Sequence, residues 1–287
     1  MALIRRSLHH NSGAANAVDY GDRVKIALMD SGIGLLAAAA AVRRLRPDAD
    51  LVVSLDPDGM PWGPRAPHDV TERALAVARA AAAHRPDALI VACNTASVHS
   101  LPALRAALEP DLPVIGTVPA IKPAAVGGGP FAIWATPATT GSPYQRGLIR
   151  DFADSAEVTE VPCPGLAQAV ESADEDAIDR AVAAAAALTP RGVRAVVLGC
   201  THYELVAERI RTAVQQPDLP PLVLHGSADA VAAQALRRLG DVPATGAPAA
   251  PFDPRLTVLL SGREGDLPVR ALGYAEGRLL AAVTQPG

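Results

Sequence analysis

Two cysteines are the residues whose types and settings point most clearly to chemistry. Cys93 lies in ACNTAS (residues 92–97) and Cys200 in GCTHY (199–203), each after an apolar run and before a helix-like pattern. Free N–H groups at a helix start favour a thiolate, so we expect both thiol pKa values below their ordinary value of about 8.5. A single such cysteine is explained by packing alone, but two matched settings indicate a reactive pair. Cys163 precedes a proline and is interpreted as structural.

The spacing around these cysteines is repeated. Cys93 comes 62 residues after Ser31, and Cys200 comes 61 residues after Thr139. Each interval begins with a hydroxyl residue just past a strand-like run and ends with a cysteine just past another. Two similar α/β halves would place both cysteines at strand C-terminal ends, where such folds bind ligands.

Three further segments carry polar or turn-forming residues. DSGIG (residues 30–34) allows close backbone approach before a helix, where an anion can bind, although it also makes an ordinary helix cap. It lacks the GxGxxG pattern, so no nicotinamide or flavin cofactor is indicated. PWG (61–63) is consistent with a simple turn, and TPATTGS (136–142) is a hydroxyl cluster ahead of a helix-like pattern.

The elements that must position these residues alternate along the chain. Continuous apolar strands separated by amphipathic helices predict an α/β fold with parallel sheets covered on both faces. A turn-rich break near residues 117–130 separates two sets of strands. The expected strands are Val24–Met29, Leu51–Leu55, Ala88–Ala92, Pro113–Gly116, Phe131–Ala135, Val158–Val161, Ala195–Leu198 and Leu222–Leu224; the expected helices include Leu35–Arg46, Val70–His84, Ala177–Leu188 and Glu204–Val214.

Composition excludes several classes of protein. The net charge of −4 lacks the basic excess of nucleic-acid-binding proteins, and no apolar run reaches the roughly 18 residues of a membrane span. Residues 1–22 lack a signal-peptide pattern and are expected to be a loose leader, and residues 243–254 are expected to be a surface loop. Three widely spaced cysteines do not make a disulfide framework, so a reducing cytoplasm is expected.

The order of segments resembles the glutamate racemase family within the aspartate/glutamate racemases. The resemblance runs over DSGIG, PWG, ACNTAS, PVIG, ATPATTGSPY, CPGLAQAVE and GCTHY, from about residue 24 to residue 240. It implies two pseudo-symmetric Rossmann-like domains with the active site in the cleft between them. The first domain would comprise residues 23–117 plus 226–287 and the second residues 118–225.

The resemblance also implies roles for individual residues. Cys93 and Cys200 would be the acid/base thiols of a cofactor-independent racemase without a metal, with Asp30 assisting Cys93, and His202 and Glu171 assisting Cys200. By itself, Glu171 would be a solvated helix charge. The residues expected to bind the substrate are Ser31, Pro61, Trp62, Gly63, Asn94, Thr95, Thr136, Thr139 and Thr201.

Racemisation needs a base on each face of the substrate. One thiolate removes the α-proton while the opposite thiol returns one, so the two exchange roles between directions. The site must stabilise a carbanion with preorganised donors and by excluding water. By family resemblance, Cys93 deprotonates the D-isomer and Cys200 the L-isomer, and D-glutamate would supply peptidoglycan for the bacterial cell wall and cell shape.

Other functions stay open at the level of sequence. Leu35, Trp62 and Glu204 depart from the family pattern, which keeps an aspartate racemase or another two-cysteine isomerase or decarboxylase in view. A redox pair of Cys93 and Cys200 is a second alternative, and a non-catalytic regulatory binding protein a third. The expected partner is a small acidic amino acid, with no nucleic acid or membrane, and a homodimer is an option because family members often dimerise.

Overall fold

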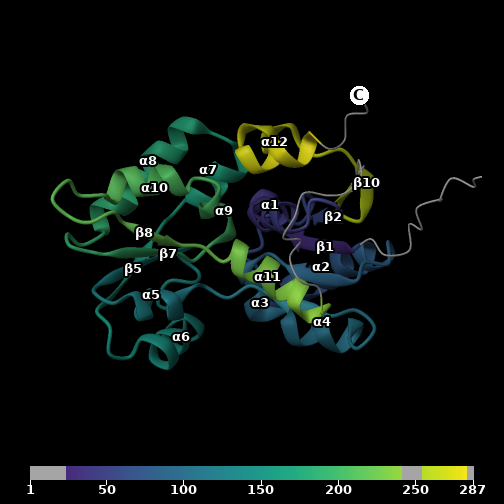
Figure 1. The fold of residues 1–287 in the computed structure, drawn as a ribbon, viewed down its shortest axis with the longest axis horizontal. Helices are drawn as coiled ribbons and strands as arrows, with labels where there is room; N and C mark the ends of the chain where they lie inside the picture. Colours follow the sequence, from purple (N-terminus) through teal and green to yellow (C-terminus); the bar gives the residue numbers. More distant parts are fainter. Residues whose placement is uncertain (1–23, 241–253, 283–287) are drawn as a thin grey trace, which may run out of the picture.

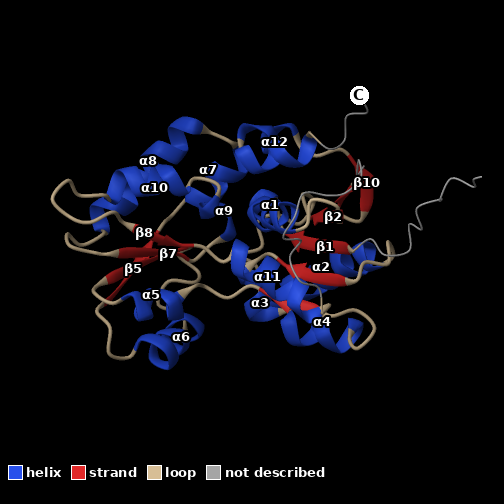
Figure 2. Cartoon of the chain, viewed as in Figure 1, coloured by secondary structure: helices blue, strands red, loops and turns tan. Residues whose placement is uncertain are grey.

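The structure is a computed structural model that describes residues 24–240 and 254–282. The expected leader, and all but the last residue of the expected loop at 243–254, lie outside the described residues. Two lobes lie side by side, and each is built on its own sheet (Figure 1). Helices enclose the strands of both lobes (Figure 2).

The first sheet has six strands in the order β10-β9-β2-β1-β3-β4, and the second has four in the order β6-β5-β7-β8. All pairs are parallel except β9 with β10. The strands are β1 (Lys25–Asp30), β2 (Asp50–Leu55), β3 (Ala88–Val91), β4 (Val114–Gly116), β5 (Phe131–Ala135), β6 (Val158–Pro162), β7 (Ala195–Leu198), β8 (Val223–His225), β9 (Leu256–Leu260) and β10 (Arg263–Gly265).

The two sheets share one topology. The order β2-β1-β3-β4 in the first sheet matches β6-β5-β7-β8 in the second, counting strands from the start of each set. Cys93 follows β3 and Cys200 follows β7, so the two cysteines occupy equivalent places. The predicted α/β fold with two pseudo-symmetric halves and parallel sheets is confirmed.

Helices cover both faces of each sheet. They are η2 (Ile33–Leu35), α1 (Leu36–Leu45), α2 (Pro67–Ala82), α3 (Asn94–His99), α4 (Leu101–Leu108), α5 (Ile121–Gly127), α6 (Pro143–Ala153), α7 (Leu166–Ser172), α8 (Glu175–Leu188), α9 (Thr201–Glu204), α10 (Ala207–Val214), α11 (Ala228–Arg238), η3 (Val269–Gly273) and α12 (Ala275–Ala281).

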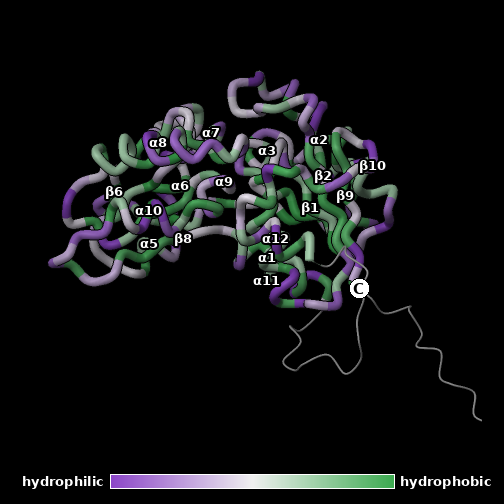
Figure 3. Tube along the Cα trace, turned by 90° about the horizontal axis from the view of Figure 1, so that it is seen from above, coloured by the Kyte–Doolittle hydropathy of each residue, from purple (hydrophilic) through white to green (hydrophobic). Residues whose placement is uncertain are grey.

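Strand β1 shows why its apolar run is continuous. Ile26 and Leu28 pack into the core cluster on the α1 side, while Ala27 and Met29 pack into the cluster on the α2 side. Because successive side chains point to opposite faces, a strand covered on both faces has no solvent-facing position. The hydropathy view shows β1 and β2 as apolar segments inside the first lobe (Figure 3).

Alanine makes α1 slim enough to be almost wholly enclosed. Its residues Leu36–Arg43 are all buried, and its neighbours include α11 and α12 from the end of the chain. Figure 1 shows α12 above α1 and next to α7, where the C-terminal segment reaches the second lobe. This placement matters for the site below.

Two features differ from the sequence-based expectation. The helix expected over Glu204–Val214 is divided into α9 and α10, with Val206 at a non-helical φ of −122° between them. Strands β9 and β10 were not among the expected strands and extend the first sheet beyond β2. Within the described ranges, no helix combines the length and apolarity that crossing a bilayer requires.

Candidate active site

One cavity of about 400 Å³ lies between the carboxyl ends of the two sheets, a volume suited to a small ligand. It contains every residue for which the sequence predicted a role. These are Asp30, Ser31, Pro61, Trp62, Gly63, Cys93, Asn94, Thr95, Thr136, Thr139, Glu171, Cys200, Thr201 and His202.

Cys93 is the residue immediately before helix α3, in extended conformation. It is buried, and that burial, with the charge and hydrogen bond of neighbouring Asp30, raises its pKa well above the ordinary value. The expectation of a lowered pKa is therefore wrong for Cys93. A six-residue helix offers a weak dipole, which does not offset desolvation and a nearby carboxylate.

Asp30 is the last residue of β1, and its side chain is hydrogen-bonded to the Cys93 thiol. Its Oδ1 accepts a hydrogen bond from the Ser31 N–H over 2.6 Å, and its Oδ2 accepts one from Thr201 Oγ1 over 3.3 Å. Complete burial raises its pKa, although His202 and Cys93 act in the opposite direction. A carboxyl group that is reluctant to ionise can hold or pass on a proton beside a thiol.

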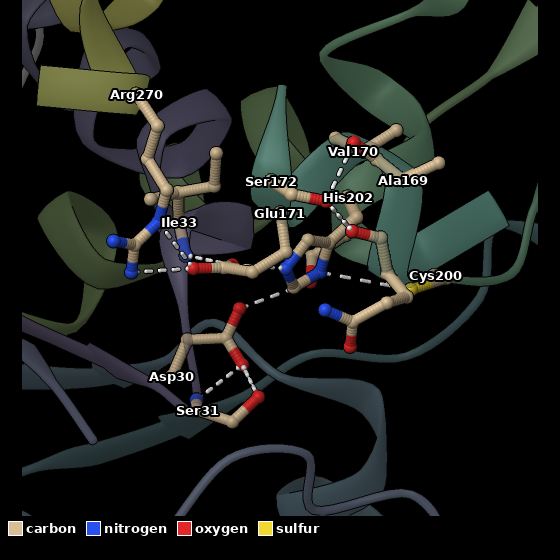
Figure 4. A network of polar contacts seen from close by, with 12 residues as sticks. Asp30, Ser31, Ile33, Ala169, Val170, Glu171, Ser172, Cys200, His202 and Arg270 are labelled. Atoms are coloured by element: carbon tan, nitrogen blue, oxygen red, sulfur yellow. Dashed lines mark hydrogen bonds and ion pairs between the residues drawn. The ribbon is translucent and has the colours of Figure 1, made fainter. Parts of the chain in front are cut away.

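Cys200 precedes α9 as Cys93 precedes α3. Its Sγ lies 3.9 Å from His202 Nδ1, and His202 Nε2 lies 2.9 Å from Glu171 Oε2 (Figure 4). Burial opposes the imidazolium, but the hydrogen bonds with Cys200 and Glu171 prevail and raise the His202 pKa well above its ordinary value. The arrangement is a thiol–imidazole–carboxylate chain.

Glu171 is buried rather than solvated, unlike the interpretation from helix periodicity alone. Its Oε2 also accepts the backbone N–H of Ile33 over 2.7 Å, and its Oε1 accepts Arg270 Nε over 2.9 Å. Burial opposes its charge, yet the bonds from His202, Ile33 and Arg270 hold its pKa below the ordinary value. Glu171 is therefore an ionised partner for His202.

The two glycines of DSGIG are required because polar side chains of the site approach their backbone closely. A Cβ on Gly32 would lie 2.0 Å from Glu171 Oε2, and one on Gly34 would lie within 2.6 Å of polar atoms of Asp30, Thr201 and His202. Any side chain at these positions would displace these polar groups.

The two cysteine-bearing turns touch each other directly. Asn94 Nδ2 donates to the Gly199 carbonyl over 3.1 Å. Asn94 Oδ1 is buried and has no protein partner, so an acceptor remains free at the cavity wall.

Trp62 is anchored from outside the cavity. Its Nε1 donates to Asp56 Oδ2 over 2.8 Å. Asp56 in turn accepts from Arg73 Nη2 over 2.6 Å and from Ser261 Oγ over 3.0 Å. The indole N–H is therefore occupied, and Trp62 lines the cavity chiefly as an apolar ring.

The other two departures from the family pattern do not line this cavity. Leu35 is fully buried in η2 as part of the core. Glu204 is turned to the start of α11, where its Oε1 accepts from both the N–H and the Oγ of Ser227 over 2.8 Å.

The cavity has further walls that the sequence did not indicate. Cys163 lines it, but its Sγ donates to the Val161 carbonyl and burial raises its pKa to about 12, which suits a packing role. Arg270 does not line the cavity but binds Glu171, and it had no sequence signal because it lies 99 residues from Glu171. The described residues contain no group of three His, Cys, Asp or Glu side chains placed to hold a metal. The other unpredicted walls are Met60, Pro64, Pro137, Ala138, Gly165, Ala167, Gln168 and Gly199.

Comparison with known proteins places this chain in a family. Residues 35–235 match the family model described as Asp/Glu/Hydantoin racemase. The chain is 36% identical over 191 residues to the glutamate racemase of Roseiflexus sp. (strain RS-1), covering 65% of this chain and 70% of that protein. It is 33% identical over 221 residues to the glutamate racemase of Pseudomonas entomophila (strain L48), covering 75% and 82%.

A solved structure agrees with these sequence relatives. The crystal structure of Escherichia coli glutamate racemase in complex with L-glutamate and the activator UDP-MurNAc-ala superposes with a TM-score of 0.71. Sequence identity is 29%, and the alignment covers 91% of this chain and 95% of that chain.

Proposed function

Because this chain belongs to the Asp/Glu/Hydantoin racemase family, we propose that it interconverts L- and D-glutamate with two cysteine thiols as the acid/base pair. The observation that carries the proposal is that Cys93 and Cys200 line one cavity from equivalent places in two matching sheets. Each thiol has its own acid/base partner, Asp30 for Cys93 and His202 for Cys200.

In one direction, the Cys93 thiolate removes the α-proton of D-glutamate. The Cα–H bond breaks, an S–H bond forms on Cys93, and the electron pair remains on Cα and its carboxylate. The Cys200 thiol then delivers its proton to the opposite face of Cα and becomes a thiolate. The reverse reaction uses the same two steps, so no proton is gained or lost overall.

The partners of each thiol support this exchange. Burial and Asp30 raise the pKa of the Cys93 thiol, so formation of the thiolate would need Asp30 to take up the proton or the substrate ammonium to lie nearby. His202 can accept the proton of Cys200 and return it, while Glu171 balances the imidazolium charge. These roles are those of general acid/base pairs tuned by burial and charge.

Recognition of the amino acid would use the polar ends of both lobes. Asn94, Thr95 and Thr201 at the starts of α3 and α9 line the cavity, where polar groups would stabilise an α-carboxylate and a developing carbanion. The unpartnered Asn94 Oδ1 is a suitable acceptor for the substrate ammonium. Hydroxyls of Ser31, Thr95, Thr139 and Thr201 would complete the binding of both carboxylates.

Glutamate is favoured over aspartate by the comparisons. The aligned Escherichia coli enzyme holds L-glutamate, and the two bacterial relatives are named glutamate racemases. The corresponding role would be to supply D-glutamate for peptidoglycan in a bacterial cytoplasm, where the three free cysteines stay reduced.

The test is α-proton exchange in D2O with the purified full-length chain. We expect deuterium at Cα of both glutamate enantiomers, with change of configuration seen by polarimetry. Exchange of aspartate but not glutamate would assign the aspartate racemase alternative. A thiol titration with and without reductant tests the redox alternative: loss of two thiols on purification, restored by reductant and without any exchange, would contradict the racemase proposal.

A further inference from the structure

We propose that Arg270 is a positioning residue for the Cys200 side of the site and acts through Glu171 and His202. The inference rests on the proposed racemase function, since it concerns the acid/base chain of that reaction. Arg270 does not line the cavity and is brought to the site by the C-terminal segment, far from every motif.

The two oxygens of Glu171 have separate partners (Figure 4). Arg270 donates to Oε1 through Nε over 2.9 Å and through Nη2 over 2.8 Å. Oε2 is left for the Ile33 N–H and for His202 Nε2. Both guanidinium nitrogens bind one oxygen and so fix the position of Oε1, and the carboxylate plane is set once Oε2 is also held by Ile33 and His202. Arg270 therefore determines how Glu171 faces His202.

The orientation of His202 follows from that of Glu171. With Nε2 held by Glu171, the ring presents Nδ1 to Cys200 Sγ at 3.9 Å. A carboxylate bound to one ring nitrogen selects which nitrogen is available for chemistry. Loss of Arg270 would leave the carboxylate free to rotate and the imidazole without a fixed direction.

Arg270 also balances charge. The side chains of Glu171 and His202 are 4% and 8% exposed, whereas Arg270 is 33% exposed. The titratable groups facing Glu171 are His202 from α9, Asp30 from β1, Arg270 from η3 and Tyr274 beyond η3. Without Arg270, His202 would be the one cation left in an ion pair with the buried Glu171 carboxylate among the described residues.

The segment that carries Arg270 spans both lobes. Helix α12 packs on α1 of the first lobe, and Tyr274 Oη donates to the Val170 carbonyl of α7 in the second lobe over 2.6 Å. The segment from Arg270 to Tyr274 thus connects the lobes beside Glu171. The mechanical connection between the lobes can be tested separately from the charge of Arg270. Tyr274 connects the lobes through its bond to the Val170 carbonyl, whereas Arg270 binds the carboxylate of Glu171.

The experiment compares pH profiles of kcat/KM for glutamate in the wild type, Arg270→Met and Arg270→Lys. Removing a cation favours protonation of its neighbours, so the acid limb of Arg270→Met moves to higher pH by about one unit. We expect kcat to fall about tenfold at neutral pH while KM changes little, because Arg270 supports the proton chain and does not line the cavity. Arg270→Lys retains the positive charge, so the acid limb of its kcat/KM profile should lie close to the pH of the wild-type limb.

Two control variants leave the cation beside Glu171 in place. Arg263→Met removes an arginine whose partner is Asp58 on the surface, and Tyr274→Phe removes only the contact to Val170. Both should keep the wild-type acid limb. The inference is overturned if Arg270→Met also keeps it, or if Tyr274→Phe moves it equally.

A second readout does not depend on activity. The His202 ring resonance of the substrate-free protein, assigned by its loss in His202→Gln, reports protonation of Glu171 as an acid-side inflection. This inflection should rise by about one pH unit in Arg270→Met and stay in place in Arg263→Met. If glutamate is not racemised but the inflection moves in Arg270→Met, only the proposed function fails. If glutamate is racemised and neither the inflection nor the acid limb moves in Arg270→Met, only the proposed role of Arg270 fails.

Discussion

Asn94 Nδ2 donates a hydrogen bond of 3.1 Å to the carbonyl of Gly199. The residue after one thiol is therefore bound to the residue before the other, across 105 positions of sequence. This bond crosses between the lobes and joins the two turns that carry the cysteines. The bond holds the two cysteine-bearing turns in a fixed position relative to each other.

Cys93→Ala and Cys200→Ala should each lower the rate of racemisation at least about a thousandfold, since each removes the thiol that exchanges the α-proton on its face. The two enantiomers have equal free energies, so kcat/KM must fall equally in both directions, which polarimetry from each pure enantiomer will measure. Cys163→Ala is the matched control and should stay active. Near wild-type activity in either of the first two variants would contradict the two-base mechanism.

Asp30→Asn should lower the pKa of the Cys93 thiol, because the charge and hydrogen bond of Asp30 raise that pKa. Thiolate absorbance followed against pH, in a background of Cys163→Ala and Cys200→Ser, measures this shift. The same single substitution should reduce kcat about a hundredfold, the scale of a lost acid/base partner. An unchanged thiol titration would show that Asp30 does not act on Cys93.

Glu171 should contribute to stability in a pH-dependent way. Its pKa lies below the ordinary value of 4.5 in the folded chain, so its contribution is present above pH 4.5 and is lost as the pH falls through the folded-state pKa. Urea unfolding of the wild type and Glu171→Gln should therefore give free energies that differ most near pH 6 and converge in acid. A constant difference down to low pH would contradict the assigned ionisation.

Trp62→Phe should alter substrate binding, because the indole lines the cavity and is anchored to Asp56. The loss of one hydrogen bond to a charged group should cost about 2 kcal/mol of unfolding free energy. Trp134→Phe is a matched control, since its Nε1 bond to Thr189 lies away from the cavity. KM for glutamate should rise only in Trp62→Phe; equal KM values in the two variants would remove Trp62 from the binding site.

Glu204→Ala should destabilise the fold without entering the chemistry. It leaves the Ser227 N–H, the Ser227 hydroxyl and the Ala228 N–H without their acceptor, at a cost of about 1 kcal/mol, typical of a lost helix cap. Thermal unfolding should show the loss, with KM unchanged. A large rise in KM would instead place Glu204 among the specificity determinants.

Local patterns were sufficient for strands β1 to β8 and for the candidate site, but not for β9 and β10. Apolar runs such as Phe131–Ala135 and Ala195–Leu198 coincide with β5 and β7, because a strand buried on both faces must be apolar throughout. The motifs ACNTAS and GCTHY, supported by family resemblance, identified both thiols. The domain boundaries and the roles of single residues stay predictions.

Only the tertiary structure decided the electrostatics of the site. Burial and the neighbouring Asp30 reverse the expected pKa shift of Cys93, and packing makes Glu171 a buried partner of His202 rather than a surface charge. Arg270 reaches Glu171 across 99 residues. These properties depend on desolvation and on distances between segments remote in sequence, so no local pattern of residue types encodes them.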